Sequence, residues 1–170
     1  LLTDLGMENA RFSIKATLTK VYFNNGKDEL EFLFSANKGG NFGELKKVAS
    51  GGELSRIMLS VKKVLSENTQ LPTIIFDEID TGVSGEVSNK IAAIMQQMSN
   101  NMQVIAITHL PQIAAKGSNH YKVYKAEVDG VTTTNLKELS SEERIIEIAE
   151  MLSGKDISDS ALTHAKELLN

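Results

Sequence analysis

The chain has 170 residues, a formal net charge of −4 and no cysteine, which excludes disulfides and thiolate metal sites and fits a reducing cytoplasm. Hydrophobic residues make up 41% and charged residues 24%, as in an ordinary globular domain, and no apolar run approaches the roughly 18 residues of a membrane span. The acidic balance argues against a chain that grips DNA over its whole surface, and we expect no membrane partner.

The first half of the chain predicts a hairpin followed by a helix. Residues 1–8 have the pattern of a helix tail. Residues 12–18 alternate between apolar and polar, and a second apolar run covers 30–34, with the turn pair Asn25-Gly26 between them. Residues 37–48 are expected to form a loop. A helix is then predicted by apolar residues at helical spacing, namely Leu54, Ile57, Met58, Val61 and Leu65.

The second half predicts strands that alternate with helices. Short apolar strands are expected at 73–76 and 104–107, with a helix at about 85–98 between them, whose apolar side holds Val87, Ile91, Ile94, Met95 and Met98. A short helix begins near Pro111, and a second hairpin turns at Asp129-Gly130. Two helices over about 141–152 and 158–169 end the chain, with Gly154 as the stop of the first.

This order of elements predicts an α/β fold, with a mostly parallel sheet, flanking helices and β-hairpins. A helix–strand–helix–strand–helix run favours parallel strands joined by crossover helices. Ligands of such sheets bind at the carboxyl ends of the strands. The segments after Phe76 and after Ile107 are therefore the places to look for chemistry.

Two carboxylates follow the first of these strands. Asp77 and Glu78 come directly after the apolar run 73–76, which is the Walker B pattern. Asp77 can help to hold Mg²⁺, which prefers oxygen ligands, and Glu78 can polarise the water that attacks a terminal phosphate. The alternative is an exposed acidic turn, and the pair alone does not decide between the two.

A serine and two glycines stand before the predicted helix at 54–65. Ser50 and Glu53 have the spacing of a capping box, which explains both residues structurally. A capping box does not explain Gly51 and Gly52, because glycine in the first turn destabilises a helix. Glycines there let a ligand approach the backbone, where exposed amides favour an anion such as phosphate. The cap and the phosphate site can coexist.

A histidine follows the second strand. A lone histidine is more often structural than catalytic, but Thr108-His109 stands at the carboxyl end of a strand, as Asp77 and Glu78 do. His109 could contact the terminal phosphate or orient the water. His120 and His164 have no comparable context and are given no role.

Together the three motifs resemble, in order, the signature, Walker B and switch histidine of ABC ATPase heads. Longer strings resemble the RecN family of bacterial SMC-like DNA-repair ATPases: KVASGGELSRIMLSVKKVL, PTIIFDEIDTGVSG and VIAITHLPQIAAKGSNHYKVYK, with DLGMENARFSI near the start and LTHAKELL near the end. The resemblance covers nearly the whole chain. It implies that residues 1–170 form a single lobe, the C-terminal lobe of such a head.

The resemblance also implies roles for residues. Asp77 would serve Mg²⁺, while Glu78 and His109 would be catalytic. Ser50, Gly51, Gly52 and Glu53 would contact ATP held by a second head of a homodimer. In the loop after Walker B, many SMC-type heads carry an aspartate where this chain has Ser84, so Asp80 and Ser84 are weaker candidates for binding the nucleotide.

One motif of a complete head is absent. No G-x-x-x-x-G-K-[ST] phosphate loop occurs in the 170 residues. In the family that loop belongs to an N-terminal lobe beyond a long coiled coil, so we expect this chain to be a fragment that is inactive alone. The implied partners are that lobe, a second head and double-stranded DNA or DNA ends, with a cytoplasmic, nucleoid-associated place of action.

Two other functions are compatible with the sequence. One is a non-catalytic dimerisation or docking module derived from an ABC head, although such a module needs none of Asp77, Glu78 and His109. The other is a metal-dependent hydrolase that uses these three residues and Asp80 as ligands. Metal binding by the isolated chain would favour the hydrolase.

Overall fold

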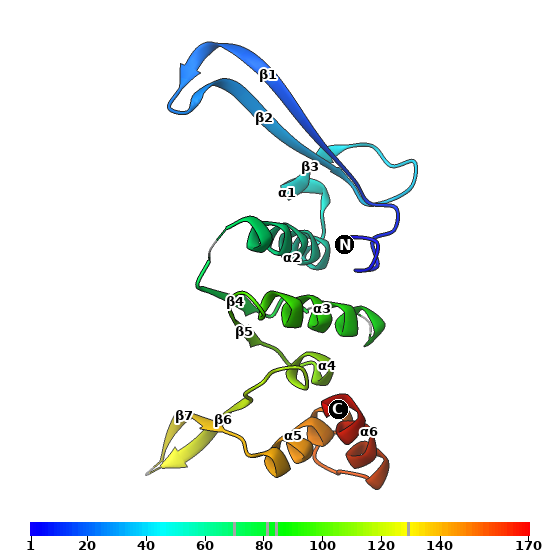
Figure 1. Cartoon of the computed structure of the whole chain (residues 1–170), viewed down its shortest axis with the longest axis vertical. Coiled ribbons are helices and arrows are strands. Elements are labelled where there is room, and N and C mark those ends of the chain that lie inside the picture. Colours follow the sequence, from blue (N-terminus) through cyan, green and yellow to red (C-terminus); the bar gives the residue numbers. More distant parts are fainter. Residues whose placement is uncertain (70, 81, 84, 129) are drawn as a thin grey trace. The chain divides into compact units, whose positions relative to one another are not determined.

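The computed structural model describes residues 1–69, 71–80, 82–83, 85–128 and 130–170. The chain forms two compact units, one comprising Leu1–Gln70 and Ile79–Lys90, the other Leu71–Glu78 and Ile91–Asn170. Its elements run from the β1–β2 hairpin near the N-terminus to helices α5 and α6 at the C-terminus (Figure 1). The single lobe over 1–170 stays a prediction.

The first unit opens on the predicted hairpin. Strands β1 (Arg11–Phe23) and β2 (Gly26–Ser35) pair antiparallel and form the long ribbon drawn in blue in Figure 1. Phe23 pairs with Gly26, so the turn lies at residues 24 and 25, one residue earlier than predicted, and Gly26 takes the positive φ of 124°. The alternation places apolar side chains on one face, and much of this face is exposed, including Ile14 at 57% and Leu18 at 75%.

Two expectations for this unit were wrong. Residues 1–8 form a series of turns and not the end of a helix, because Gly6 has a left-handed φ of 74° that no helix continues through. The expected loop at 37–48 contains strand β3 (Gly43–Glu44), which pairs with β2, and the one-turn helix α1 (Leu45–Val48). The core of the unit is built on Met7, Phe34 and Ile57.

The helix predicted around residues 54–65 is confirmed as α2 (Gly51–Asn68). Its predicted apolar side is only partly covered. Ile57 is 3% exposed, whereas Met58, Val61 and Leu65 are more than 40% exposed. Exposed apolar groups on one helix side are typical of a surface that another element covers.

Helix α3 (Gly85–Met98) has the bounds that the sequence predicts. It begins in the first unit and ends in the second. Its predicted apolar side is buried, since Ile91, Ile94, Met95 and Met98 are at most 6% exposed. Spacing of 3 and 4 residues therefore identified the inward side of this helix correctly.

The second unit contains the predicted parallel pair, β4 (Thr73–Asp77) and β5 (Gln103–Ile107). Among the described strands this is the parallel pairing, and the other pairings are antiparallel. Burial of these two strands is incomplete, contrary to the apolar pattern, because Ile75, Ile105 and Ile107 are 63%, 41% and 54% exposed. Parallel strands are usually covered on both faces, so this pair presents an uncovered apolar surface.

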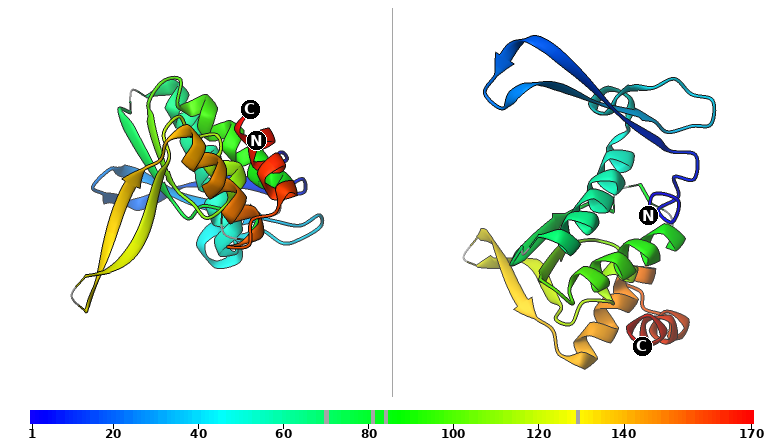
Figure 2. Two further views of the ribbon diagram at one scale, coloured as in Figure 1. Left: turned by 90° about the horizontal axis from the view of Figure 1, so that it is seen from below. Right: turned by 45° about the horizontal axis from the view of Figure 1, so that its top comes forward.

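The rest of the second unit matches the predicted order. Helix α4 (Pro111–Ala114) begins at Pro111, and β6 (Tyr121–Val128) and β7 (Val131–Glu138) form the second hairpin. Residue 129 of its predicted turn lies outside the described residues. Helices α5 (Ser141–Ser153) and α6 (Asp159–Leu169) lie side by side (Figure 2), and Gly154 ends α5 with a φ of 80°. Within the described residues, no helix is both long and apolar enough to cross a membrane.

Candidate functional site

The register of β4 and β5 brings two of the predicted motifs to one edge of the sheet. Asp77, the last residue of β4, pairs with Ile107, the last residue of β5. The backbone amide of Glu78 donates a hydrogen bond of 3.1 Å to the carbonyl oxygen of Ile107. Glu78 and the Thr108-His109 pair therefore leave the sheet at the same edge, which is where ligands of parallel sheets bind.

Glu78 has an uncommon backbone conformation. Its φ is 46°, and among the described residues it is the non-glycine residue with a positive φ. A glutamate in this left-handed region is strained, and such strain persists only where surrounding contacts enforce it, often at functional sites. The hydrogen bond to Ile107 is one such contact. No side-chain pattern in the sequence signals this conformation.

Thr108 and His109 connect the end of β5 to helix α4. The hydroxyl of Thr108 accepts a 3.0 Å hydrogen bond from the amide of Leu110, the N-cap residue of α4. His109 is exposed, as are Asp77 and Glu78. Three polar side chains at the ends of two adjacent parallel strands are thus accessible to a ligand.

The signature segment begins the longest helix of the first unit. Ser50 is the N-cap of α2 and forms the predicted capping box: the amide of Glu53 donates to Ser50 Oγ at 3.3 Å, and the Ser50 amide donates to Glu53 Oε2 at 2.8 Å. The Ser50 hydroxyl also donates to Glu53 Oε2 at 2.8 Å. The structural explanation of Ser50 and Glu53 is confirmed.

The fold does not require glycine at position 51. Its φ is outside the left-handed region, and a Cβ built there meets no atom within 4 Å. The residue is exposed in the first turn of an 18-residue helix. An open, unhindered helix start fits the approach of a phosphate, since the first amides and the helix dipole favour an anion.

The remaining candidates fall in different environments. Asp80 is buried, with 2% of its surface exposed, in contrast to Asp77 and Glu78. Ser84 lies outside the described residues. Among the residues that the structure describes, no three His, Cys, Asp or Glu side chains lie close enough together to hold a metal ion.

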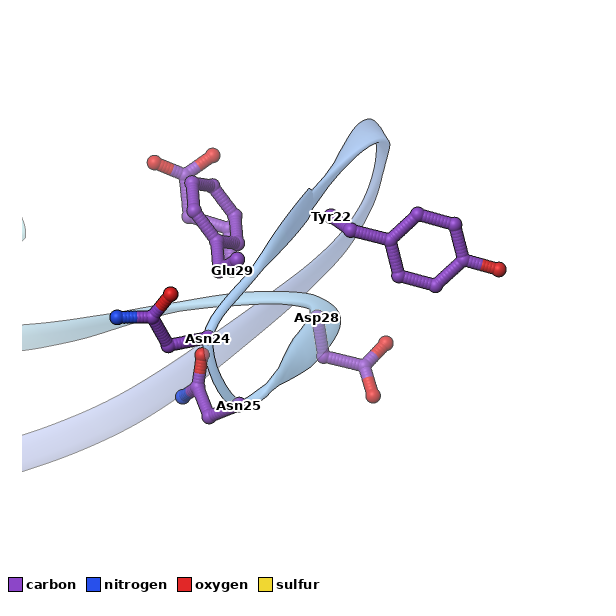
Figure 3. Close-up of a pocket in the computed structure, with 6 residues that line it drawn as sticks. Tyr22, Asn24, Asn25, Asp28 and Glu29 are labelled. Atoms are coloured by element: carbon purple, nitrogen blue, oxygen red, sulfur yellow. The ribbon is translucent and has the colours of Figure 1, made fainter.

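A shallow hollow lies away from these motifs, at the turn of the β1–β2 hairpin. Its lining residues are Tyr22, Phe23, Asn24, Asn25, Asp28 and Glu29. Figure 3 shows the labelled side chains pointing in different directions, so their polar groups do not converge on one point. None of the candidate site residues lines this hollow.

The chain is similar to DNA repair proteins over nearly its whole length. It is 43% identical over 173 residues to DNA repair protein RecN of Halalkalibacterium halodurans, an alignment that covers 99% of this chain and 31% of the relative. It is 48% identical over 144 residues to DNA repair protein RecN of Bacillus subtilis, covering 85% of this chain and 25% of the relative. The chain thus spans about a third or less of the length of these relatives. No family model matches it.

Solved structures with the same fold are heads of Smc proteins. The Smc head domain with a coiled coil and joint from Pyrococcus yayanosii has a TM-score of 0.64 at 21% identity, with 90% of this chain and 28% of that chain covered. A structure from a study of ATP-driven dimerization and DNA-stimulated activation of SMC ATPases has a TM-score of 0.53 at 21% identity, with 82% of each chain covered. These likenesses establish the α/β fold of an SMC-type head lobe. With 40–48% identity to many RecN proteins, this chain belongs to the RecN family, of whose members it corresponds to a C-terminal part.

Proposed function

We propose that the chain is the C-terminal half of an ATP-hydrolysing, SMC-like head that acts in DNA double-strand-break repair and recombination. The observation that carries the proposal is the geometry of one sheet edge. Asp77 and Ile107 are in register, and Glu78 is held in a left-handed conformation by its bond to Ile107. Two exposed carboxylates beside a histidine are the groups that hydrolysis of a terminal phosphate uses.

Each residue at this edge has a separate proposed role. Asp77 holds Mg²⁺ through an oxygen ligand, and the exposed carboxylate at the end of a strand fits that ion. The ion, when bound, neutralises charge on the phosphates of ATP. Glu78 orients a water and accepts its proton, and His109 contacts the terminal phosphate.

The α2 N-terminus would serve a different nucleotide. In the proposed dimer, ATP lies between two heads, and Ser50, Gly51, Gly52 and Glu53 of one head face the ATP of the other. The open space at Gly51 supports this role, and ATP-driven dimerization of SMC ATPases, whose fold this chain shares, is consistent with it. Asp80 and Ser84 are proposed to bind nucleotide on the resemblance alone.

The remaining proposed partners are an N-terminal lobe and DNA, and each is supported by a different observation. Ile75, Ile105 and Ile107 stay exposed on a parallel strand pair, which supports docking of an N-terminal lobe that carries the phosphate loop and a coiled coil. DNA ends or duplexes are proposed as the ligand of the complete dimer, because the relatives are DNA repair proteins. The proposed place of action is the nucleoid in the cytoplasm.

The test is Glu78→Gln in the complete protein. The amide keeps the shape of the side chain but cannot accept the proton of the water, so hydrolysis should fall by about 100-fold or more while ATP binding is kept. ATP should then accumulate in closed dimers. The measurements are phosphate release and equilibrium ATP binding.

Glu86→Gln is the matched control. Glu86 is an exposed glutamate in the first turn of α3 that pairs with Lys90 and has no proposed role at the nucleotide, so its amide variant should hydrolyse ATP normally. Near-normal turnover by Glu78→Gln would remove Glu78 from catalysis. No ATP hydrolysis by the wild-type complete protein would favour the alternative function, a dimerisation or docking module without catalysis.

A further inference from the structure

Arg144 on helix α5 binds the segment that follows His109 and α4. The Arg144 guanidinium donates hydrogen bonds to the carbonyl oxygens of Ala115 (3.3 Å), Gly117 (2.6 Å) and Ser118 (3.2 Å). These carbonyls lie at and just after the end of α4. A single side chain, 26 to 29 residues away in sequence, thus binds three carbonyls of the C-cap and the turn that follows α4.

The same helix end is also anchored by packing. Ala115 is 5% exposed and belongs to the apolar cluster of α5 and α6, which includes Ile148, Ala149, Ala161 and Ala165. Helix α4 has four residues, too few to be stable without external contacts. Its position is therefore set by α5 and α6 through Ala115 and Arg144.

Helix α5 is itself fixed by packing, because Ile148 and Ala149 are fully buried in the apolar cluster with α6, so it can serve as a support without the partly exposed ion pairs that add to its anchoring. Lys122 on β6 forms ion pairs with Glu147 and Glu150 of α5, the latter at 3.0 Å, and Lys137 on β7 pairs with Glu143. Arg144 lies on the same helix between these anchored glutamates. A half-buried arginine on an immobilised helix holds its partners more firmly than one on a loop.

Few residues separate the clamped segment from the candidate site. His109 is followed by Leu110, whose carbonyl accepts the amides of Ile113 and Ala114 at 3.1 Å, and the amide of Ala115 bonds to the Pro111 carbonyl at 2.9 Å. This continuous turn links His109 at one end to the Arg144 contacts at the other. This turn is a short hydrogen-bonded path by which a displacement of Ala115 reaches His109.

We propose that Arg144 is a positioning residue for His109: by clamping the carbonyls at the end of α4, it holds the histidine at the sheet edge where Glu78 stands. This inference rests on the proposed function, since it assigns Arg144 a part in ATP hydrolysis. Arginine is suited to the task because its planar fork presents several donors at fixed angles, which the single ammonium group of lysine does not.

The test uses Arg144→Met and Arg144→Lys in the complete protein, with steady-state ATP hydrolysis, ATP binding and melting temperature measured on each. Arg144→Met should lower kcat on the order of tenfold, because small displacements of a catalytic group are costly, while ATP affinity changes by less than about twofold. Arg144→Lys should recover only part of the lost kcat. If kcat falls in these variants while the affinity for ATP is kept, the result supports Arg144 as a positioning residue for His109.

Lys122→Met is the control for simple destabilisation. It removes the ion pairs of α5 with β6 but leaves the three carbonyl bonds of Arg144. Its melting temperature should fall while kcat stays within about twofold of the wild type. An unchanged kcat in Arg144→Met, or an equal loss of kcat in Lys122→Met at the same melting temperature, would overturn the assignment.

Glu78→Gln is measured alongside to separate the two proposals. If Glu78→Gln stops hydrolysis and Arg144→Met does not slow it, only the role of Arg144 fails. If Glu78→Gln hydrolyses ATP normally, only the role of Glu78 fails. If the wild-type complete protein hydrolyses no ATP, the proposed function fails, and the role of Arg144 fails with it.

Discussion

At the scale of single residues, Ser50 has one established role and one proposed role. Its hydroxyl is engaged with Glu53 in the capping box, so contact with a nucleotide would exchange one of these hydrogen bonds for a bond to phosphate. Ser50→Asp separates the roles, because aspartate is an equally good N-cap but repels phosphate. We expect a modest fall in melting temperature, because the new carboxylate loses the hydrogen bond to Glu53 Oε2, and a complete loss of ATP-dependent dimerisation, measured by sedimentation of the complete protein.

Ser50→Ala is the complementary variant. It removes the cap and should cost about 1 kcal/mol of stability, while the small side chain leaves room for the nucleotide and allows dimerisation. Intact ATP-driven dimerisation in Ser50→Asp would leave Ser50 with its capping role alone.

His120 predicts a dependence of stability on pH. Burial is the main cause that lowers the pKa of its imidazole below the ordinary value, and the positive charges of Arg144 and Lys122 add to it, while Glu147 opposes them. The folded chain therefore resists a proton that the unfolded chain accepts below about pH 6.5. Stability contributed by neutral His120 should be present above that pH and lost as the pH falls through it.

The measurement is the urea midpoint of the chain at pH 5.5 and pH 7.5. The wild type should gain stability over this interval, and His120→Gln should gain less. His164→Gln is the control, because His164 is exposed on α6 and carries no such burial cost. A pH dependence in His120→Gln equal to that of the wild type would contradict the assignment.

Side-chain chemistry was predictable at this scale, but backbone strain was not. The placement of Asp77, Glu78 and His109 after two strands follows from an apolar run that ends in polar residues, and the parallel register brings those ends together. The left-handed φ of Glu78 accompanies a backbone hydrogen bond to Ile107, about 30 residues away, and no local pattern encodes such a tertiary contact. The hydrogen bonds from Arg144 to three carbonyls could not be predicted from the sequence either, because they join residues far apart in the chain.

At the scale of elements, periodicity predicted types and bounds well where one side of the element is buried. Helix α3 matches its prediction because Ile91, Ile94, Met95 and Met98 are buried on one side. Turns were less accurate: the pair Asn25-Gly26 was expected to form the first hairpin turn, but the pairing of Phe23 with Gly26 shifts it by one residue. Turn position depends on strand register, which a dipeptide signal does not fix.

The helix tail predicted at residues 1–8 was wrong because a local pattern did not fix the backbone conformation. Leu1, Leu2 and Leu5 have helix-like spacing, and Leu5 and Met7 are buried. Gly6 sits between them in a left-handed conformation, and a Cβ there would lie 3.2 Å from the Val87 side chain. Apolar residues can thus enter a core from a series of turns, and hydrophobic spacing over eight residues does not distinguish this from a helix.

At the scale of the whole molecule, two groups of apolar side chains are exposed to solvent. The parallel strands leave Ile75, Ile105 and Ile107 open, and α2 leaves Met58, Val61 and Leu65 open. These residues gave apolar patterns in the sequence because they are suited to burial, and their exposure supports the proposal that a further lobe covers them. The sequence could therefore predict which side chains favour a core without predicting that they would be uncovered here.

The proposed function as one half of a head predicts that the isolated chain neither binds ATP tightly nor hydrolyses it. Most contacts to the phosphates of ATP in P-loop proteins come from the amides and lysine of the G-x-x-x-x-G-K-[ST] loop, which these 170 residues do not contain. Asp77, Glu78 and His109 lie at one edge, but their proposed partners are Mg²⁺, water and the terminal phosphate, and these contacts would not hold the nucleotide as a whole. A calorimetric ATP titration and a phosphate-release assay on this chain, with the complete protein as the positive control, should therefore give no binding in the micromolar range and no turnover above background. Sub-micromolar affinity, or turnover that Glu78→Gln abolishes, would mean that the residues in these 170 positions form a working nucleotide site by themselves.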